Sequence, residues 1–268
     1  MHEKTESTMT DSTPARLGFI GTGTIAAAIV EGLALSGEEP ILLSPRNADI
    51  AARLSDRFSH VGVANDNQAV LDQSDLVILA VRPQIADSVL EDLKFRPDHR
   101  ILSLIATVSL ARLREWTAPA ATVVRGVPLP PVARGEGPTP IFPPDKEARA
   151  LFDRLGTAIE LADESAFDIF TAASATMASY FAFAHSITAW MQRHGTDAAQ
   201  AHRFVAQMLK GLSETAAIAP DAGFAALADE HQTRGGINEQ VFRTVTRDGV
   251  IDNLDHALDD VLRRLRPE

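Results

Sequence analysis

The sequence predicts an α/β fold in which a doubly wound parallel sheet is followed by an all-helical domain. Over residues 16–160, short apolar runs alternate with stretches of helical periodicity, which is the pattern of βαβ units. After residue 160 the β-branched runs end, and long Ala-rich segments follow without a strand signal. We therefore expect a disordered tail over residues 1–14, a sheet domain over 15–162 and a helical domain over 163–268.

Six strands are predicted in the sheet domain. Asp75–Val81 (DLVILAV) is a nearly continuous apolar run, which is typical of a strand covered on both faces. The other strands are expected at Arg16–Gly21, Ile41–Ser44, Val61–Ala64, Arg100–Ile105 and from Ala121 to Arg125. Helical periodicity between the strands predicts helices over Thr24–Leu35, Asp49–Phe58, Asn67–Leu71, Ile85–Leu93 and Leu110–Trp116. The stretch Pro128–Pro144 is rich in Pro and Gly, so we expect it to link strands of the sheet.

The helical domain contains five predicted helices, at Ala166–His194, Ala198–Ala217, Phe224–Asp229, Asn238–Asp248 and Ile251–Leu265. Residues 169–192 carry no charge, which is long enough to suggest a membrane span. Polar residues such as Ser174 and Thr188 interrupt this stretch and Ala dominates it. We therefore expect a helix buried in protein, with His185 as a hydrogen-bonded core histidine rather than a proton donor.

Composition and charge exclude several classes of protein. The chain has 268 residues and a net charge of −11, so it lacks the basic surface of a nucleic-acid-binding protein. It contains no cysteine, which excludes disulfides, thiolate nucleophiles and Cys-ligated metals, and the histidines show no metal-binding spacing. Residues 1–14 have no apolar core typical of a signal peptide, so we expect a cytoplasmic protein without metal, nucleic-acid or membrane partners.

A glycine-rich turn joins the first predicted strand to the first predicted helix. Gly21-Thr-Gly23-Thr-Ile-Ala26 fits the pattern G-x-G-x-x-G/A in this strand–turn–helix context. The first glycine allows the tight turn, the second lets a pyrophosphate approach the backbone, and the small last residue brings helix and sheet together. The motif predicts a Rossmann-type dinucleotide-binding domain, and the alternative is a tight turn without a ligand.

The end of the second predicted strand favours NADP(H) over NAD(H). An acidic residue usually binds the ribose hydroxyl of NAD at this position. Here the chain reads Leu43-Ser44-Pro45-Arg46-Asn47, so donors take the place of the acid, and a guanidinium suits a 2′-phosphate. The alternative is that Arg46 is an ordinary loop charge.

With these motifs the chain resembles the pyrroline-5-carboxylate reductase family, whose members reduce a cyclic imine to proline with NAD(P)H. The strongest matches are GFIGTGTIAAAIVEGL at residues 18–33 and DLVILAVRPQ at residues 75–84. Weaker matches follow in the same order, at Ile101–Val108, Arg125–Pro131 and Thr233–Asn238. The resemblance implies a helical domain that dimerises and helps to bind substrate. It also implies that Ile169–Met191 and Phe204–Ala219 pair with a second copy.

The resemblance also implies which residues form the site. The cofactor-binding residues would be Gly21, Thr22, Gly23, Thr24, Ile25, Ser44, Arg46, Asn47, Asn67, Ala80, Val81, Arg82, Pro83 and Ala106, with Ala106 beside the nicotinamide. The substrate-binding residues would be Thr233, Gly235, Gly236, Ile237 and Asn238, and Asn238 is the candidate catalytic residue. Asn238 is also a favoured helix cap, and Glu239 is more typical of a partner for the helix dipole than of an iminium ligand.

Several segments depart from the family pattern. Leu129 stands where the family has an asparagine, and only Tyr180 is kept of a Ser-Gly-Pro-Ala-Tyr segment. In the family the Gly-Gly loop continues with two small residues, often ending in Thr, whereas here it continues with Ile237-Asn238-Glu239-Gln240. Because the phosphate-binding parts are intact, the pattern fits a reductase acting on C=N bonds, with pyrroline-5-carboxylate or a close analogue as substrate. Arg125 and Arg134 are substrate-carboxylate ligands or, as we favour, plain loop charges.

Two other functions stay open at this point. A β-hydroxyacid-dehydrogenase-like oxidoreductase would need a catalytic lysine on the helix after the nucleotide domain, and Ala166–His194 contains none. A non-catalytic NADPH-binding sensor or interaction protein would explain the altered substrate segments.

Overall fold

The computed structural model describes residues 16–218, 221 and 223–266, and the expected tail over residues 1–14 lies outside this range. The chain divides into two compact units, one up to Phe167 and the other from Asp168 onward. The second unit thus begins five residues after the expected position 163. The reason is that Phe167, only 3% exposed, packs with the first unit under the Arg125 guanidinium.

The first unit is built on one eight-stranded sheet with the order β3-β2-β1-β4-β5-β6-β7-β8. All neighbouring strands are parallel except β6 and β7. The chain moves outward from β1 to β3 and then returns to the other side of β1, where Phe19 lies beside Ile78 of β4. The strands are β1 (Leu17–Ile20), β2 (Ile41–Leu43), β3 (Val61–Val63), β4 (Leu76–Leu79), β5 (Arg100–Ser103), β6 (Thr122–Gly126), β7 (Gly137–Phe142) and β8 (Gly156–Glu160).

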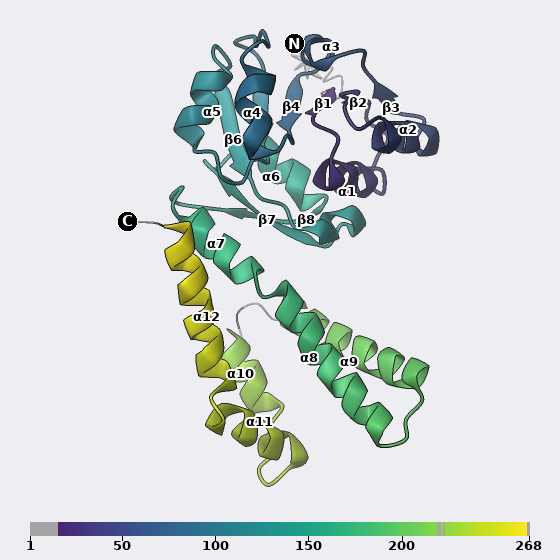
Figure 1. Ribbon diagram of the computed structural model, residues 1–268, viewed down its shortest axis with the longest axis vertical. Coiled ribbons are helices and arrows are strands. Elements are labelled where there is room, and N and C mark those ends of the chain that lie inside the picture. Colours follow the sequence, from purple (N-terminus) through teal and green to yellow (C-terminus); the bar gives the residue numbers. More distant parts are fainter. Residues whose placement is uncertain (1–15, 219–220, 222, 267–268) are drawn as a thin grey trace, which may run out of the picture. The chain divides into compact units, whose positions relative to one another are not determined.

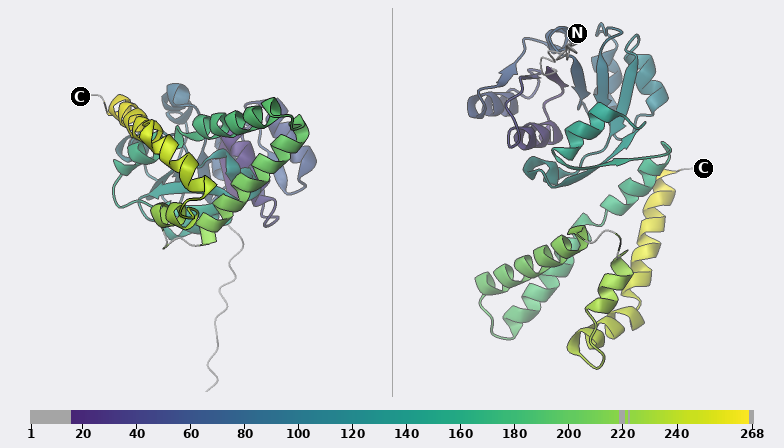
Figure 2. Two further views of the ribbon diagram at one scale, coloured as in Figure 1. Left: turned by 90° about the horizontal axis from the view of Figure 1, so that it is seen from below. Right: turned by 180° about the vertical axis from the view of Figure 1, so that it is seen from behind.

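Helices cover both faces of this sheet and create two separate cores. Because side chains alternate along a strand, Phe19 faces one core and Ile20 the other, and both are fully buried. Figure 1 shows α4 and α5 in front of the sheet. The view from behind in Figure 2 shows α6 on the opposite face. The helices are α1 (Thr24–Leu33), α2 (Ala48–Arg57), α3 (Asn67–Asp72), α4 (Pro83–Leu90), α5 (Leu110–Trp116) and α6 (Lys146–Asp153), with a 3-10 helix at Pro130–Arg134.

The Pro-rich stretch 128–144 contains β7, although its composition predicts only a link between strands. Gly137 donates its N–H to Leu155, and Ile141 accepts from Leu161, so these residues face β8. Pro138 and Pro140 alternate with them and face the β6 side, where the ladder covers only Arg125–Gly126 and the Pro140 carbonyl accepts the N–H of Val127. The missing proline N–H groups therefore cost the β7–β8 ladder nothing, and the strand forms despite its composition.

The second unit is all-helical in its described part. Its helices are α7 (Ala166–Ser174), α8 (Met177–Arg193), α9 (Ala198–Ile218), α10 (Gly223–Glu230), α11 (Ile237–Arg247) and α12 (Val250–Leu265). The single helix expected over residues 166–194 is therefore two helices, which are separated at Ala175 and Thr176. No described helix is long and apolar enough to cross a membrane.

The expected burial of the uncharged stretch is wrong for the single chain. None of the residues of α8, all of them described, is buried. Phe181 is 69% exposed and Phe183 is 58% exposed. His185 is exposed as well, so it is not a core histidine. Large apolar side chains of α8 are thus left uncovered by the unit to which the helix belongs. Such an exposed apolar surface is typical of a helix that packs against a further surface.

Candidate functional site

A cavity of about 640 Å³ opens beyond the carboxyl ends of the central strands. It lies at β1, where the order of the strands reverses, and this is the usual ligand position in such sheets. Four loops contribute its lining, which consists of Gly21, Thr22, Gly23, Thr24, Ile25, Arg46, Asn47, Ala80, Val81, Arg82, Pro83, Ile85, Leu104, Ile105 and Ala106. The structure thus brings together all the predicted cofactor-binding residues except Ser44 and Asn67.

The two glycines of the first loop have different structural roles. Gly21 has φ +98°, and a Cβ there would lie 2.7 Å from the carbonyl carbon of Ala80. Gly23 has φ −95° and caps α1 without a side-chain hydrogen bond, and a Cβ there would meet nothing within 4 Å. The turn therefore requires glycine at position 21. At position 23 glycine leaves open space in front of the helix N-terminus, where first-turn N–H groups suit a phosphate. The loop fits the pyrophosphate of a dinucleotide.

Ser44 is not part of the cavity wall, contrary to its expected place near the adenosine. It is fully buried, and its Oγ accepts the backbone N–H of Gly21 at 2.9 Å. Its carbonyl oxygen accepts the hydroxyl of Thr22 at 2.8 Å. Ser44 therefore fixes the glycine loop from behind. The lining of the cavity on this side begins at Arg46, two residues after Ser44.

Arg46 and Asn47 lie on the β2 side of the cavity. Asn47 caps α2 with φ +65°, a left-handed conformation that Asn tolerates better than most residues. Arg46, next to it, is exposed at the cavity wall. A cation beside a helix N-terminus is a suitable partner for a phosphate.

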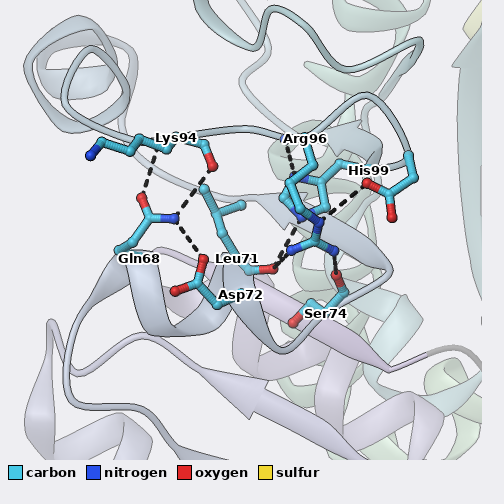
Figure 3. Close-up of polar contacts among 8 residues, drawn as sticks. Gln68, Leu71, Asp72, Ser74, Lys94, Arg96 and His99 are labelled. Atoms are coloured by element: carbon cyan, nitrogen blue, oxygen red, sulfur yellow. Dashed lines mark hydrogen bonds and ion pairs between the residues drawn. The ribbon is translucent and has the colours of Figure 1, made fainter.

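Asn67 is half-buried at the first position of α3, and it is not among the residues that line the cavity. A polar network holds the helix behind it (Figure 3). Gln68 brackets the backbone of Lys94, accepting its N–H at 2.9 Å and donating to its carbonyl at 3.3 Å. Arg96 donates to the carbonyl oxygens of Leu71 and Ser74. The network fixes α3 to the loop that precedes β5.

His99 is the buried member of this network, with 1% of its surface exposed. Its Nδ1 accepts the backbone N–H of Arg96 at 3.0 Å, so its Nε2 carries the hydrogen that faces the carbonyl of Leu71 at 3.1 Å. The ring is thus held in its neutral form. Burial, together with the charge of Arg96, lowers the pKa of His99.

Three further residues, Ile85, Leu104 and Ile105, line the cavity and are not among the cofactor-binding residues predicted from the sequence. Leu104 and Ile105 directly follow β5, and residues in that position commonly line the crevice of an open α/β sheet. Their apolar character made them look like part of the strand. The signal that could have found them is their place immediately before Ala106.

The two uncertain arginines have different environments. Arg134 is exposed and pairs with Glu136 at 3.3 Å, which agrees with a loop charge. Arg125 is 6% exposed and binds both Glu164 and the carbonyl oxygen of Ala106. The interpretation of Arg125 as a plain loop charge is therefore wrong, because its guanidinium is buried and forms an ion pair with Glu164 of the same unit.

The predicted substrate loop connects α10 to α11 in the second unit. Gly235 has φ +77°, and Gly236 donates its N–H to the carbonyl of Thr233 at 2.7 Å and caps α11. Asn238 is therefore the second residue of the helix, and the interpretation of Asn238 as the cap is wrong. Its Nδ2 donates to the carbonyl of His231 at 3.0 Å, and Ile237 is 81% exposed.

Glu239 acts at the start of α11. Its Oε2 accepts the N–H of Gly235 at 2.6 Å, and its Oε1 pairs with Arg243 at 2.6 Å, one turn further on. This resembles a capping box, in which a third-position Glu reaches back to the loop. The interpretation of Glu239 as a partner of the helix start agrees with these contacts.

Comparisons with known proteins agree with this architecture. Residues 16–107 match the family model described as NADP oxidoreductase coenzyme F420-dependent, and residues 164–267 match the model for pyrroline-5-carboxylate reductase dimerisation. A pyrroline-5-carboxylate reductase of Pseudomonas aeruginosa is 27% identical over 94% of this chain and 96% of its own length. Pyrroline-5-carboxylate reductase 3 of Xenopus laevis is 30% identical over 73% of this chain and 75% of its own length.

A solved structure shares the fold along nearly the whole chain. The pyrroline carboxylate reductase of Plasmodium falciparum, whose structure has NADP bound, superimposes with a TM-score of 0.75 at 20% identity. The superposition covers 94% of this chain and 97% of that one. This superposition shows the shared fold, and the relative from Xenopus laevis, at 30% identity over 73% of this chain, shows the family. The present chain therefore belongs to the pyrroline-5-carboxylate reductase family.

Proposed function

We propose that this protein reduces pyrroline-5-carboxylate to proline with NADPH. The observation that supports this most strongly is the cavity at the reversal of strand order. It is lined by the glycine loop and by the segments after β2, β4 and β5, in a member of this reductase family. A β-hydroxyacid-dehydrogenase-like function is not favoured, because the relatives are pyrroline-5-carboxylate reductases.

The cavity has the features that a dinucleotide phosphate needs. The N-terminus of α1, with Gly23 left open in front of it, would hold the pyrophosphate, and Arg46 would hold the 2′-phosphate. When bound, the nicotinamide supplies the hydride that reduces the C=N bond. The apolar side chains of Ile85, Leu104 and Ile105 exclude water from the cavity wall, which protects such a transfer.

The loop before α11 is the proposed substrate-binding segment, and it offers donors to a carboxylate. The N–H groups of Ile237 and Asn238 belong to the first turn of α11, and first-turn N–H groups have no acceptor within their own helix. They are therefore suitable donors to an anion. Asn238 would hydrogen-bond the substrate nitrogen or carboxylate by releasing its bond to His231. Leu129 lacks the hydrogen-bonding group of the family's asparagine, so a close analogue of pyrroline-5-carboxylate is the second candidate substrate.

We further propose that the functional unit is a homodimer. The second unit matches the family's dimerisation model over residues 164–267. Several large apolar side chains of α8 and α9 are exposed in the single chain, among them Phe181, Phe183, Trp190 and Phe204. A second copy that covers them would bury the surface that the chain leaves open, as in other symmetric oligomers.

The test is NADPH oxidation at 340 nm by the purified protein, with pyrroline-5-carboxylate, piperideine carboxylates and carboxylate-free cyclic imines as separate substrates. Turnover of pyrroline-5-carboxylate at about 1–10³ per second supports the proposal. Turnover of one of the other imines, without turnover of pyrroline-5-carboxylate, would identify that imine as the substrate instead. Saturable NADPH binding without turnover of any imine would favour a non-catalytic sensor.

A further inference from the structure

The buried arginine Arg125 holds both ends of one short segment at the cavity. Its Nη2 donates to the carbonyl oxygen of Ala106 at 2.7 Å, and its Nη1 pairs with Oε1 of Glu164. The same Glu164 oxygen accepts the backbone N–H of Leu110 at 2.6 Å. One ion pair therefore fixes the first and the last residue of the segment Ala106–Leu110.

The two ends of this segment differ in their other support. Leu110 is buried and Val108 packs against the core, whereas Ala106 and Thr107 are exposed. Apolar packing therefore holds the end of the segment at α5, and the bond from Arg125 fixes the exposed end at the cavity. Arg125 itself is 6% exposed, and its guanidinium lies 4.5 Å from the centre of the Phe167 ring. A buried guanidinium is costly unless it is paired, and here Glu164 and the carbonyl oxygen of Ala106 are its partners. Two oriented hydrogen bonds and a stacked ring are what an arginine provides and a lysine does not.

The segment lies at the end of the cavity opposite to Arg46. Along the sheet, Arg46 follows β2, the glycine loop follows β1 and Ala106 follows β5, which are in the spatial order β2-β1-β4-β5. A dinucleotide spans this crevice with its pyrophosphate at the glycine loop. If the 2′-phosphate lies at Arg46, its nicotinamide lies on the β5 side.

We propose that the Arg125–Glu164 pair is a positioning device that holds Ala106–Leu110 against the nicotinamide half of the cofactor. This inference rests on the proposed binding of NADPH in the cavity. Neither residue lines the cavity, so the pair acts through the backbone that it holds. Loosening it leaves the phosphate-binding parts intact and misplaces the wall beside the nicotinamide.

The variants Arg125→Lys and Glu164→Gln test this role, with Arg154→Lys as a matched control. Arg154 pairs with Glu39 at 2.6 Å and contacts Ser36, away from the residues that line the cavity. Each protein is titrated with NADPH and with 2′-phospho-ADP-ribose, which lacks the nicotinamide. The fluorescence of bound NADPH, kcat with pyrroline-5-carboxylate and the Tm are measured on the same samples.

We expect Arg125→Lys to bind 2′-phospho-ADP-ribose as the wild type does. Its bound NADPH should fluoresce more like free NADPH, and its kcat should fall about 10- to 100-fold, as for a misplaced reacting group. Glu164→Gln keeps an acceptor for both neighbours and should show a smaller change in the same direction. Arg154→Lys should change the Tm only.

A wild-type fluorescence and kcat in Arg125→Lys would overturn the proposal, even if the Tm fell. If Arg125→Lys does not fold, a folded Glu164→Gln with unchanged fluorescence and kcat would overturn it. The binding measurements do not depend on the substrate. A wild-type protein that binds NADPH but leaves pyrroline-5-carboxylate unreduced would contradict the proposed function and still test the positioning role.

Discussion

The Oγ atom of Ser44 accepts the backbone N–H of Gly21 at 2.9 Å, and it thereby joins the end of β2 to the first residue of the glycine loop. Both residues are buried, and Thr22 adds a second bond to the carbonyl oxygen of Ser44. In a low-dielectric environment, a buried N–H that loses its acceptor is expensive. The shape of the phosphate loop thus depends on a side chain 23 residues further along the chain.

Replacing Ser44 by Ala tests this link. The Gly21 N–H would lose its buried acceptor, so we expect the free energy of unfolding to fall by about 1–3 kcal/mol. NADPH binding should weaken as well, because the loop is no longer fixed. The control is Ser55→Ala, since the half-buried Ser55 donates an exposed hydrogen bond to the carbonyl oxygen of Ala52 in its own helix. Urea unfolding and NADPH titration of both variants measure the difference, and equal effects would contradict the role of Ser44.

The two loop glycines should respond differently to the same substitution. Gly21→Ala would combine a positive φ, which costs about 1–2 kcal/mol, with a Cβ 2.7 Å from the carbonyl carbon of Ala80. It should lower both stability and NADPH affinity. Gly23→Ala meets no protein atom within 4 Å and should keep the Tm, while its methyl group occupies the space in front of α1 and weakens NADPH binding. A Gly23→Ala protein with unchanged affinity would contradict the phosphate position.

Arg46 should determine the preference between the two nicotinamide cofactors. Removing a hydrogen bond to a charged group costs about 1.5–3 kcal/mol, so Arg46→Ala should weaken NADPH binding about 10- to 100-fold. NADH lacks the 2′-phosphate, so its affinity should change little. Arg53→Ala, on the exposed side of α2, is the control. Parallel losses for NADPH and NADH would show that Arg46 does not bind the 2′-phosphate.

Asn238 should affect the substrate rather than the cofactor. Its bond to the His231 carbonyl is worth about 1 kcal/mol, so Asn238→Ala should remain folded. If the side chain binds the substrate, KM for pyrroline-5-carboxylate should rise while the Kd for NADPH stays constant. Gln240→Ala, an amide truncation two residues further along the exposed part of α11, is the control. Steady-state kinetics decides, and an unchanged KM and kcat would remove Asn238 from the site.

His99 should make stability depend on pH. Burial lowers its pKa below the ordinary value of about 6.5, so the unfolded chain takes up a proton before the folded chain does. The stabilisation by neutral His99 is fully present above pH 6.5, and it is lost as the pH falls from 6.5 through the lowered pKa of the folded state. His99→Asn keeps an acceptor and a donor for the same network but does not titrate. It should therefore make the free energy of unfolding depend less on pH below 6.5. Urea unfolding between pH 5 and 8 measures it, and equal slopes would exclude His99.

The sequence alone determined the two-part organisation and most elements of the sheet domain. Apolar runs and helical periodicity are local properties, so the helix Leu110–Trp116 was predicted to the residue. The glycine loop was equally predictable, because a turn with φ +98° needs glycine at Gly21 whatever surrounds it. Most of the predicted cofactor-binding residues share one cavity, because they lie at or just after the carboxyl ends of predicted strands, which meet at one edge of the sheet.

Only the tertiary structure decided what depends on distant partners. β7 forms in a proline-rich stretch because its prolines face the side without a full ladder, and no local pattern contains that information. The partners of Arg125 lie 19 and 39 residues away in the chain, which turns an apparent loop charge into a buried clamp. The spacing of apolar residues in the sequence predicts which residues belong to the same helix or strand. Which polar groups meet in the interior is set by the packing of several elements, because buried donors and acceptors must find partners there.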